Sequence, residues 1–180
     1  MTFRLETERL VLREWDDSDL DEFLVIRQDP RVMATLGPLQ SREEVAALIQ
    51  RMQTLQSELG HCFWAVEHRK DKRLIGWCGL IRGGENTPVA GKLEIGWTLA
   101  SGYWGHGYAT EAANTALDWA LSHFPDETVW SITSVNNRKS RAVMDKLGLT
   151  YLPQYDFDHP KVDPDSNLLR HVTYRYERNR

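Results

Sequence analysis

The sequence predicts a single α/β (α+β) domain over residues 1–180, in which helices cover both faces of a mixed, mostly antiparallel sheet of about seven strands. Extended, apolar-rich runs alternate along the chain with segments of helical periodicity. The length of 180 residues suits one domain, and contents of 41% hydrophobic and 27% charged residues are typical of a globular protein. No linker, repeat or low-complexity tract divides the chain.

The first third of the chain is predicted to contain one strand and two helices. Residues 9–15 alternate between apolar and polar types, and the acidic cluster that follows them marks a helix N-terminus. The first helix is short, because Pro30 interrupts its periodicity. Ser41 and Glu44 form an S-x-x-E capping box at the start of a longer second helix, which Gly60 ends.

The middle of the chain is predicted to form a hairpin, another strand and a long helix. The runs CFWAVEHR (62–69) and LIGWCGLIR (74–82) are separated by a polar turn, which indicates an antiparallel pair. A further strand at 92–99 leads through a glycine-containing loop into the helix. The helix is rich in alanine on one stripe, so it is expected to lie close to the sheet.

The last third is predicted to add a strand at 128–135, a short helix at 138–147 and two more extended runs at 149–157 and 168–177. Gly148 suits the left-handed residue that often ends a helix, with the next residue supplying an apolar contact. The two final runs are divided by the polar loop DHPKVDPDSN.

Charge and composition exclude several classes of protein. The formal net charge of −4 offers no basic surface for nucleic acid. No apolar stretch approaches the ~20 residues that cross a bilayer, and the N-terminus lacks a signal-type run, so a cytoplasmic protein without membrane contact is expected. Cys62 and Cys78 each lie in a predicted strand, which indicates buried thiols. The histidines show no metal-binding spacing, and no metal site is expected.

The segment WGHGYAT (104–110) joins a strand to the long helix and is the strongest candidate for a ligand site. Gly105 and Gly107 lack Cβ atoms, so phosphate oxygens can approach the main chain, and the first amides of the helix point toward them. The alternative is that the glycines only permit a turn. His106 either meets a phosphate when protonated or is a solvated loop side chain. Neither a P-loop pattern nor a G-x-G-x-x-G fingerprint is present.

Three stretches of the chain carry a resemblance to a known family. LETERLVLREWDDSDL, EIGWTLASGYWGHGYATEA and SVNNRKSRAVMDKLGLTY resemble the first strand and helix, the acetyl-CoA motif and the second core motif of the GNAT superfamily N-acetyltransferases. Within the superfamily they are most similar to the RimJ/RimL-like branch, the ribosomal-protein-alanine acetyltransferase type, as is the tail LLRHVTYRYER. The resemblance implies a GNAT fold with splayed central strands and acetyl-CoA as cosubstrate.

The same resemblance implies which residues bind acetyl-CoA. The loop pattern Q/R-x-x-G-x-G/A falls on Trp104, Gly107 and Ala109, and its main-chain amides are expected to hold the diphosphate. The pantetheine arm is expected to pair with the backbone of Trp97 and Leu99. The full set of expected cofactor-binding residues is Trp97, Leu99, Trp104, Gly105, His106, Gly107, Tyr108, Ala109, Thr110 and Asn137. Asn137 is alternatively, or also, the N-cap of the following helix.

Acetyl transfer to an amine needs a base, because a lysine-like amine with a pKa near ~10.4 is protonated at neutral pH. By the resemblance Glu94 is the candidate base, and its alternative is a surface carboxylate paired with Lys92 on the same strand face. A main-chain N–H around residues 95–97 is expected to stabilise the carbonyl oxygen as it gains charge. Ser140 is the candidate acid, since Met144 stands where a tyrosine is common. Its hydroxyl alternatively bonds the preceding helical turn.

The acceptor is expected to be an amine, either a peptide N-terminus or a small amine. The loop at 153–167 carries four aspartates against one lysine and is expected either to attract a cationic acceptor or to be a solvated surface. A homodimer is one candidate assembly. The alternatives to an enzyme are a non-catalytic GNAT-fold sensor or scaffold that binds acyl-CoA, and a nucleotide-binding domain based on the glycines alone.

Overall fold

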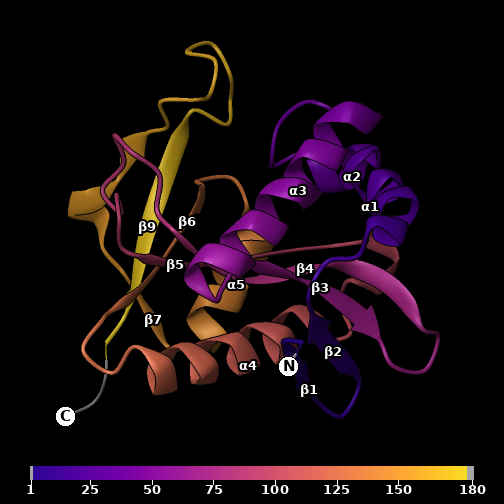
Figure 1. Ribbon diagram of the computed structural model, residues 1–180. Coiled ribbons are helices and arrows are strands. Elements are labelled where there is room, and N and C mark those ends of the chain that lie inside the picture. The colour runs from indigo at the N-terminus through magenta and orange to yellow at the C-terminus, as the bar shows by residue number, and fades with distance from the viewer. Residues whose placement is uncertain (1, 178–180) are drawn as a thin grey trace.

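The computed structural model describes residues 2–177, and within them nine strands form one sheet with helices on both faces (Figure 1). The predicted domain boundaries of 1–180 include four residues, 1 and 178–180, that lie outside this range. The strand order is β1-β2-β3-β4-β5-β6-β9-β7, and β8 pairs with β9. The strands are β1 Arg4–Glu6, β2 Leu10–Arg13, β3 Phe63–His68, β4 Arg73–Arg82, β5 Leu93–Leu99, β6 Val129–Ser134, β7 Leu149–Tyr151, β8 Phe157–Asp158 and β9 Arg170–Tyr176.

The predicted mixed, mostly antiparallel sheet is confirmed, with β5 and β6 as the parallel pair of strands in the described chain. The structure has two more strands than the seven expected. The short strand β1 pairs with β2 and was not predicted. The run expected at 149–157 is divided into β7 and β8 by a turn at Pro153–Tyr155, because proline cannot donate to a strand ladder.

The helices are α1 Leu20–Arg27, α2 Pro30–Met33, α3 Arg42–Leu59, α4 Tyr108–His123 and α5 Arg138–Lys146. Figure 1 shows α1, α2 and α3 on one side of the sheet and α4 on the other, where α5 packs beside α4. The capping box is confirmed, since Ser41 Oγ accepts from the Glu44 amide at 3.2 Å and Glu44 accepts from the Ser41 amide at 2.7 Å. Gly60 and Gly148 adopt the left-handed conformation expected of them, with φ of 75° and 77°.

The helix α2 was not predicted, because Pro30 starts a helix instead of only ending one. Proline suits the first position of a helix, where its missing N–H has no intrahelical partner. Asp29 caps this turn by accepting from the Arg31 amide at 2.9 Å.

The core lies between the sheet and its helices. Cys62 and Cys78 are fully buried free thiols, as expected, and burial raises the pKa of each. Alanines of α4 at positions 112, 113, 116 and 120 are fully buried, which lets the helix lie close to β4 and β5. Over residues 2–177, no helix combines the length and apolar character needed to cross a bilayer.

Candidate active site

The centre of the sheet opens between β5 and β6. These two strands pair only at Leu93 with Val129 and at Glu94 with Trp130, although both strands continue beyond these residues. One residue further on, Ile95 and Ser131 do not form a backbone pair; the Ser131 hydroxyl instead donates to the Ile95 carbonyl oxygen at 2.9 Å. The two strands are therefore splayed, as the resemblance implied.

The splay leaves backbone groups of β5 directed toward the gap. The Ala100 amide donates to the Ile75 carbonyl of the preceding strand at 2.8 Å. Because successive amides of a strand point in opposite directions, the amides of Trp97 and Leu99 point away from β4 and toward the gap. The Leu99 carbonyl is partly engaged, since the Trp104 indole N–H donates to it at 2.9 Å.

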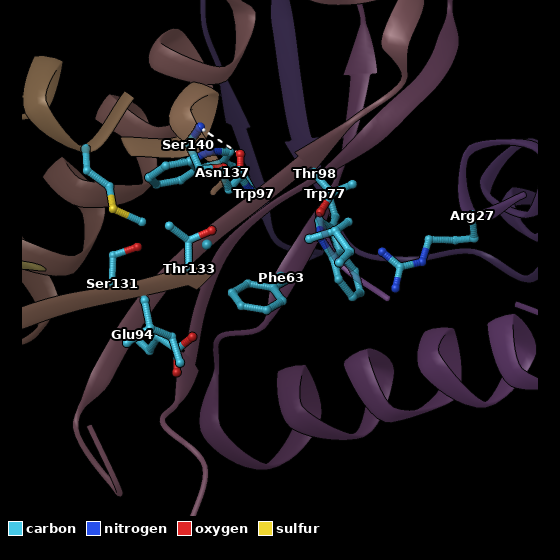
Figure 2. Close-up of a pocket in the computed structure, with 14 residues that line it drawn as sticks. Arg27, Phe63, Trp77, Glu94, Trp97, Thr98, Ser131, Thr133, Asn137 and Ser140 are labelled. Carbon is cyan, nitrogen blue, oxygen red and sulfur yellow. Dashed lines mark hydrogen bonds between the residues drawn. The ribbon is translucent and has the colours of Figure 1, made fainter. Parts of the chain in front are cut away.

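A cavity of about 210 Å³ lies at the splay (Figure 2). Four of the predicted site residues line it together, namely Glu94, Trp97, Asn137 and Ser140. The predicted residues Leu99 and 104–110 are not among its lining residues. Other lining side chains were not predicted and come from α1, β3, β4 and β6, namely Arg27, Phe63, Trp77 and Thr133.

Glu94 is held in an environment that disfavours its charge. Burial raises the pKa of its carboxyl group to about 7, and the positive charge of Arg51 on α3 opposes this rise. The alternative pairing with Lys92 is not present. The Lys92 ammonium instead donates to the Pro88 carbonyl at 2.8 Å and lies 4.0 Å from the centre of the Trp130 ring.

Asn137 and Ser140 lie at the start of α5. The Asn137 side chain accepts from the Ser140 amide at 3.2 Å, so the expected N-cap role is confirmed (Figure 2). Among residues 2–177, no protein group bonds the Ser140 hydroxyl, so the alternative of a bond to the preceding turn is not observed. The Thr133 hydroxyl on β6 is a second oxygen in the cavity wall and was missed, because a strand threonine gives no catalytic signal.

The glycine loop precedes α4 as predicted. Gly105 and Gly107 have φ of 80° and 82°, a conformation that residues with a Cβ rarely adopt. The first helical bond joins the Glu111 amide to the Gly107 carbonyl at 3.0 Å. No backbone or side-chain acceptor within the described chain bonds the amides of residues 105–110, so these amides are available to an anion.

Arg9 adds a positive charge to this loop and was missed by sequence reasoning. Its guanidinium donates to the His106 carbonyl at 3.0 Å, pairs with Glu111 at 2.6 Å and stacks 4.4 Å from the centre of the Tyr108 ring. The His106 side chain itself is exposed. Arg9 and Glu111 are about a hundred positions apart in sequence, and no local pattern connects them.

The described residues contain no group of three or more histidine, cysteine, aspartate or glutamate side chains placed to hold a metal ion.

The chain matches the family described as acetyltransferase (GNAT) domain over residues 9–150, which is most of its length. This protein belongs to the GNAT acetyltransferase family. GNAT acetyltransferases use acetyl-CoA, so this chain is an acetyl-CoA-dependent acetyltransferase.

Individual proteins similar to this chain include two named as acetyltransferases. The chain is 29% identical to the uncharacterized protein YkkB of Bacillus subtilis, over 82% of this chain and 86% of YkkB. It is 26% identical to the uncharacterized N-acetyltransferase YoaA of the same organism, over 80% and 81% of the two chains. An acetyltransferase structure from Agrobacterium tumefaciens is 29% identical, with a TM-score of 0.80 over 99% of this chain and 96% of that one.

The RimJ/RimL-like branch is represented among proteins of the same fold. A RimL ribosomal-protein acetyltransferase in complex with coenzyme A matches 97% of this chain and 97% of its own, with a TM-score of 0.77. At 14% identity this match shows the fold alone.

Proposed function

We propose that this enzyme transfers the acetyl group of acetyl-CoA to a primary amine, with Glu94 as the base and the whole chain, residues 1–180, acting as one domain. The observation that supports this most directly is a carboxyl group whose pKa is about 7, in the wall of a cavity at the splay between β5 and β6. A base is most effective when its pKa lies near the working pH. A carboxyl group at its ordinary pKa of ~4.3 is a much weaker base.

The residues of the splay and the glycine loop fit acetyl-CoA as the second substrate. The free amides of residues 105–110 and the N-terminus of α4 suit the diphosphate, and Arg9 adds a cation beside them. The amides of Trp97 and Leu99 face the gap, where they suit the pantetheine amides, and Asn137 lines the same cavity as Trp97. The bound cosubstrate supplies the acetyl thioester.

The pKa of Glu94 favours one kind of acceptor amine. Taking a proton from a lysine-like amine with a pKa near ~10.4 is uphill by about 3 pH units, whereas an α-amine near ~8 differs by only about 1. Glu94 therefore suits α-amines, which is consistent with a RimJ/RimL-like activity on a peptide N-terminus and with small α-amines. We expect the enzyme to be cytoplasmic and to meet either kind of acceptor there.

Two further groups have roles in this proposal. A main-chain N–H of β5 around residues 95–97 stabilises the thioester carbonyl oxygen as it gains charge. Ser140 protonates the departing thiolate, because its hydroxyl lines the cavity and bonds no protein group in the described chain. A thiol with a pKa near ~8.5 leaves readily, so this help matters less than that of the base.

An acceptor screen tests the proposed function. Release of free thiol from acetyl-CoA is measured with peptides carrying different N-termini, small α-amines and ω-amines, for the wild type and Glu94→Gln. The proposal expects turnover with α-amines, greatly reduced in the variant. If the wild type releases no thiol above the rate of hydrolysis with any amine, the proposal is wrong.

A further inference from the structure

A buried arginine lines the same cavity and has no acidic partner. Arg27 lies in the last turn of α1, and only 8% of its surface is exposed. Its Nε donates to the Gln40 side-chain oxygen at 2.6 Å. Within residues 2–177, no ion pair involves Arg27 and no protein acceptor bonds its two terminal nitrogens.

The guanidinium is directed toward the aromatic part of the cavity. The central carbon of the guanidinium lies 5.4 Å from the centre of the Trp77 ring, and the centres of the Trp77 and Phe63 rings are 5.1 Å apart (Figure 2). In Figure 2, Glu94 and Arg27 lie at opposite ends of the group of residues drawn, with the two aromatic rings between them. The cavity thus has an acidic end, an apolar middle and a basic end.

An unpaired buried cation is unusual, because charged side chains are rarely buried without a partner. Burial lowers the pKa of Arg27 only to about 10, so the guanidinium remains charged at neutral pH. One N–H of five is used by Gln40, and the four N–H groups of the terminal nitrogens remain. A planar guanidinium presents such groups in a fork that matches a carboxylate or phosphate.

We infer that Arg27 binds an oxyanion of the acceptor, so that the acceptor carries an acidic group, a carboxylate or a phosphate, as well as its primary amine. This inference rests on the proposed function of the cavity. The acidic loop at 153–167 does not line the cavity. Two of its carboxylates are engaged locally, since Asp158 pairs with Arg170 and Asp156 accepts from the Tyr151 hydroxyl. The fixed positive charge that an acceptor meets inside the cavity is that of Arg27.

Matched acceptors test the inference. Amino carboxylates and aminoalkyl phosphates of increasing chain length are compared with alkylamines of the same length that carry no acidic group. The wild type is expected to show a KM at least about tenfold lower for the acid-bearing acceptor of suitable length, the effect of one or two charge-assisted hydrogen bonds. The preferred anion distinguishes a carboxylate from a phosphate. Equal KM values across all matched pairs would overturn the inference.

Variants separate the role of Arg27 from a general effect on the fold. Arg27→Gln should raise KM for acid-bearing acceptors about tenfold more than it raises KM for alkylamines without an acidic group, so the preference disappears. Arg27→Lys keeps the charge but loses the forked guanidinium, so it should retain part of the preference for acid-bearing acceptors. The control Arg42→Gln removes an exposed arginine that pairs with Asp21 outside the cavity, and should behave as wild type. An unchanged preference in folded Arg27→Gln contradicts the inference.

Binding without turnover distinguishes this inference from the proposed function. Calorimetric titration uses the N-acetylated form of the preferred acid, which cannot accept a second acetyl group, against the same compound with its acid esterified. Binding of the acid alone, lost in Arg27→Gln and weakened in Arg27→Lys, supports the inference whether or not turnover occurs. Equal binding of acid and ester overturns it, even if the enzyme acetylates amines.

Discussion

The raised pKa of Glu94 predicts how the activity depends on pH. The carboxyl group must be ionised to accept a proton, so kcat should rise with pH through about 7 and level off above it. In Glu94→Gln this rise of kcat with pH, the acidic limb of the profile, should be absent. At pH 7, kcat should be lower by roughly 10² to 10⁴, the usual contribution of a positioned base. At high pH part of the loss should be recovered, because more of the amine is already neutral.

A second substitution tests the cause of this pH dependence. Arg51 on α3 lowers the pKa of Glu94 against the effect of burial, so Arg51→Gln should shift the same limb to higher pH without abolishing it. The measurement is a pH-rate profile at saturating acetyl-CoA for the wild type and both variants. A Glu94→Gln profile that matches wild type from pH 6 to 9 would assign the proton transfer to water or to another group.

Ser140 should matter less than Glu94. Its replacement in Ser140→Ala removes a hydroxyl beside the proposed leaving group, and we expect kcat to fall by about tenfold with no recovery at high pH. Asn137 should still cap α5, because the bond at this cap uses the Ser140 amide and not its side chain. A loss as large as that of Glu94→Gln would mean that Ser140 has another role. Thr133→Val then tests whether the second hydroxyl of the cavity compensates.

At the scale of single elements, the role of the glycine loop before α4 can be tested by comparing Gly107→Ala with a control, Gly102→Ala. Gly107 has a φ of 82°, and a Cβ there is strained by roughly 1 kcal/mol or more. Gly107→Ala should therefore lower the melting temperature by about 2 to 4 °C per kcal/mol and also weaken acetyl-CoA binding, because the adjacent amides move. The dissociation constant is measured by calorimetry.

Gly102→Ala is the control for this variant. Gly102 is exposed, has no positive φ, and a Cβ there meets no atom within 4 Å. Both the melting temperature and the affinity for acetyl-CoA should stay near wild type. If Gly107→Ala binds acetyl-CoA as tightly as Gly102→Ala does, the loop amides contribute little to binding.

The sequence predicted correctly those elements whose start, end or turn is marked by residues close together in the chain. The capping box of α3, the hairpin of β3 and β4 and the glycine at the start of α4 all depend on residues within a few positions of each other. The strand β1 has only three residues, too few for a clear alternation. The local signal of α2, Asp29 followed by Pro30, was interpreted as the end of α1 and not as the start of a new helix. The number of strands was therefore too low while the class of fold was right.

The site was predictable only in part for the same reason. Glu94, Trp97, Asn137 and Ser140 lie in or next to motifs that resemble a family, and the structure brings them to one cavity. Arg27 reaches that cavity because of how α1 packs on β4, which its own sequence does not specify. The same applies to Phe63, Trp77 and Thr133.

For the whole molecule, acetyl-CoA should stabilise the native state. A ligand at a hundredfold excess over its dissociation constant adds about 2.7 kcal/mol to the free energy of unfolding. A thermal scan should show a higher melting temperature with acetyl-CoA and a much smaller change with ATP, which lacks the pantetheine arm. An equal shift with ATP would favour a nucleotide site in the glycine loop. No shift with either ligand would contradict the assigned binding residues.

The splay between β5 and β6 means that the middle of this sheet lacks a partner strand along part of its length. Amides in that position are protected from solvent exchange only when something bonds them. In the free protein, the amides of Trp97 and Leu99 should exchange with deuterium far faster than that of Ala100, which donates to Ile75. With acetyl-CoA bound, they should become as slow as Ala100. The cosubstrate would then act as the missing strand, and the sheet would be complete only during the catalytic cycle.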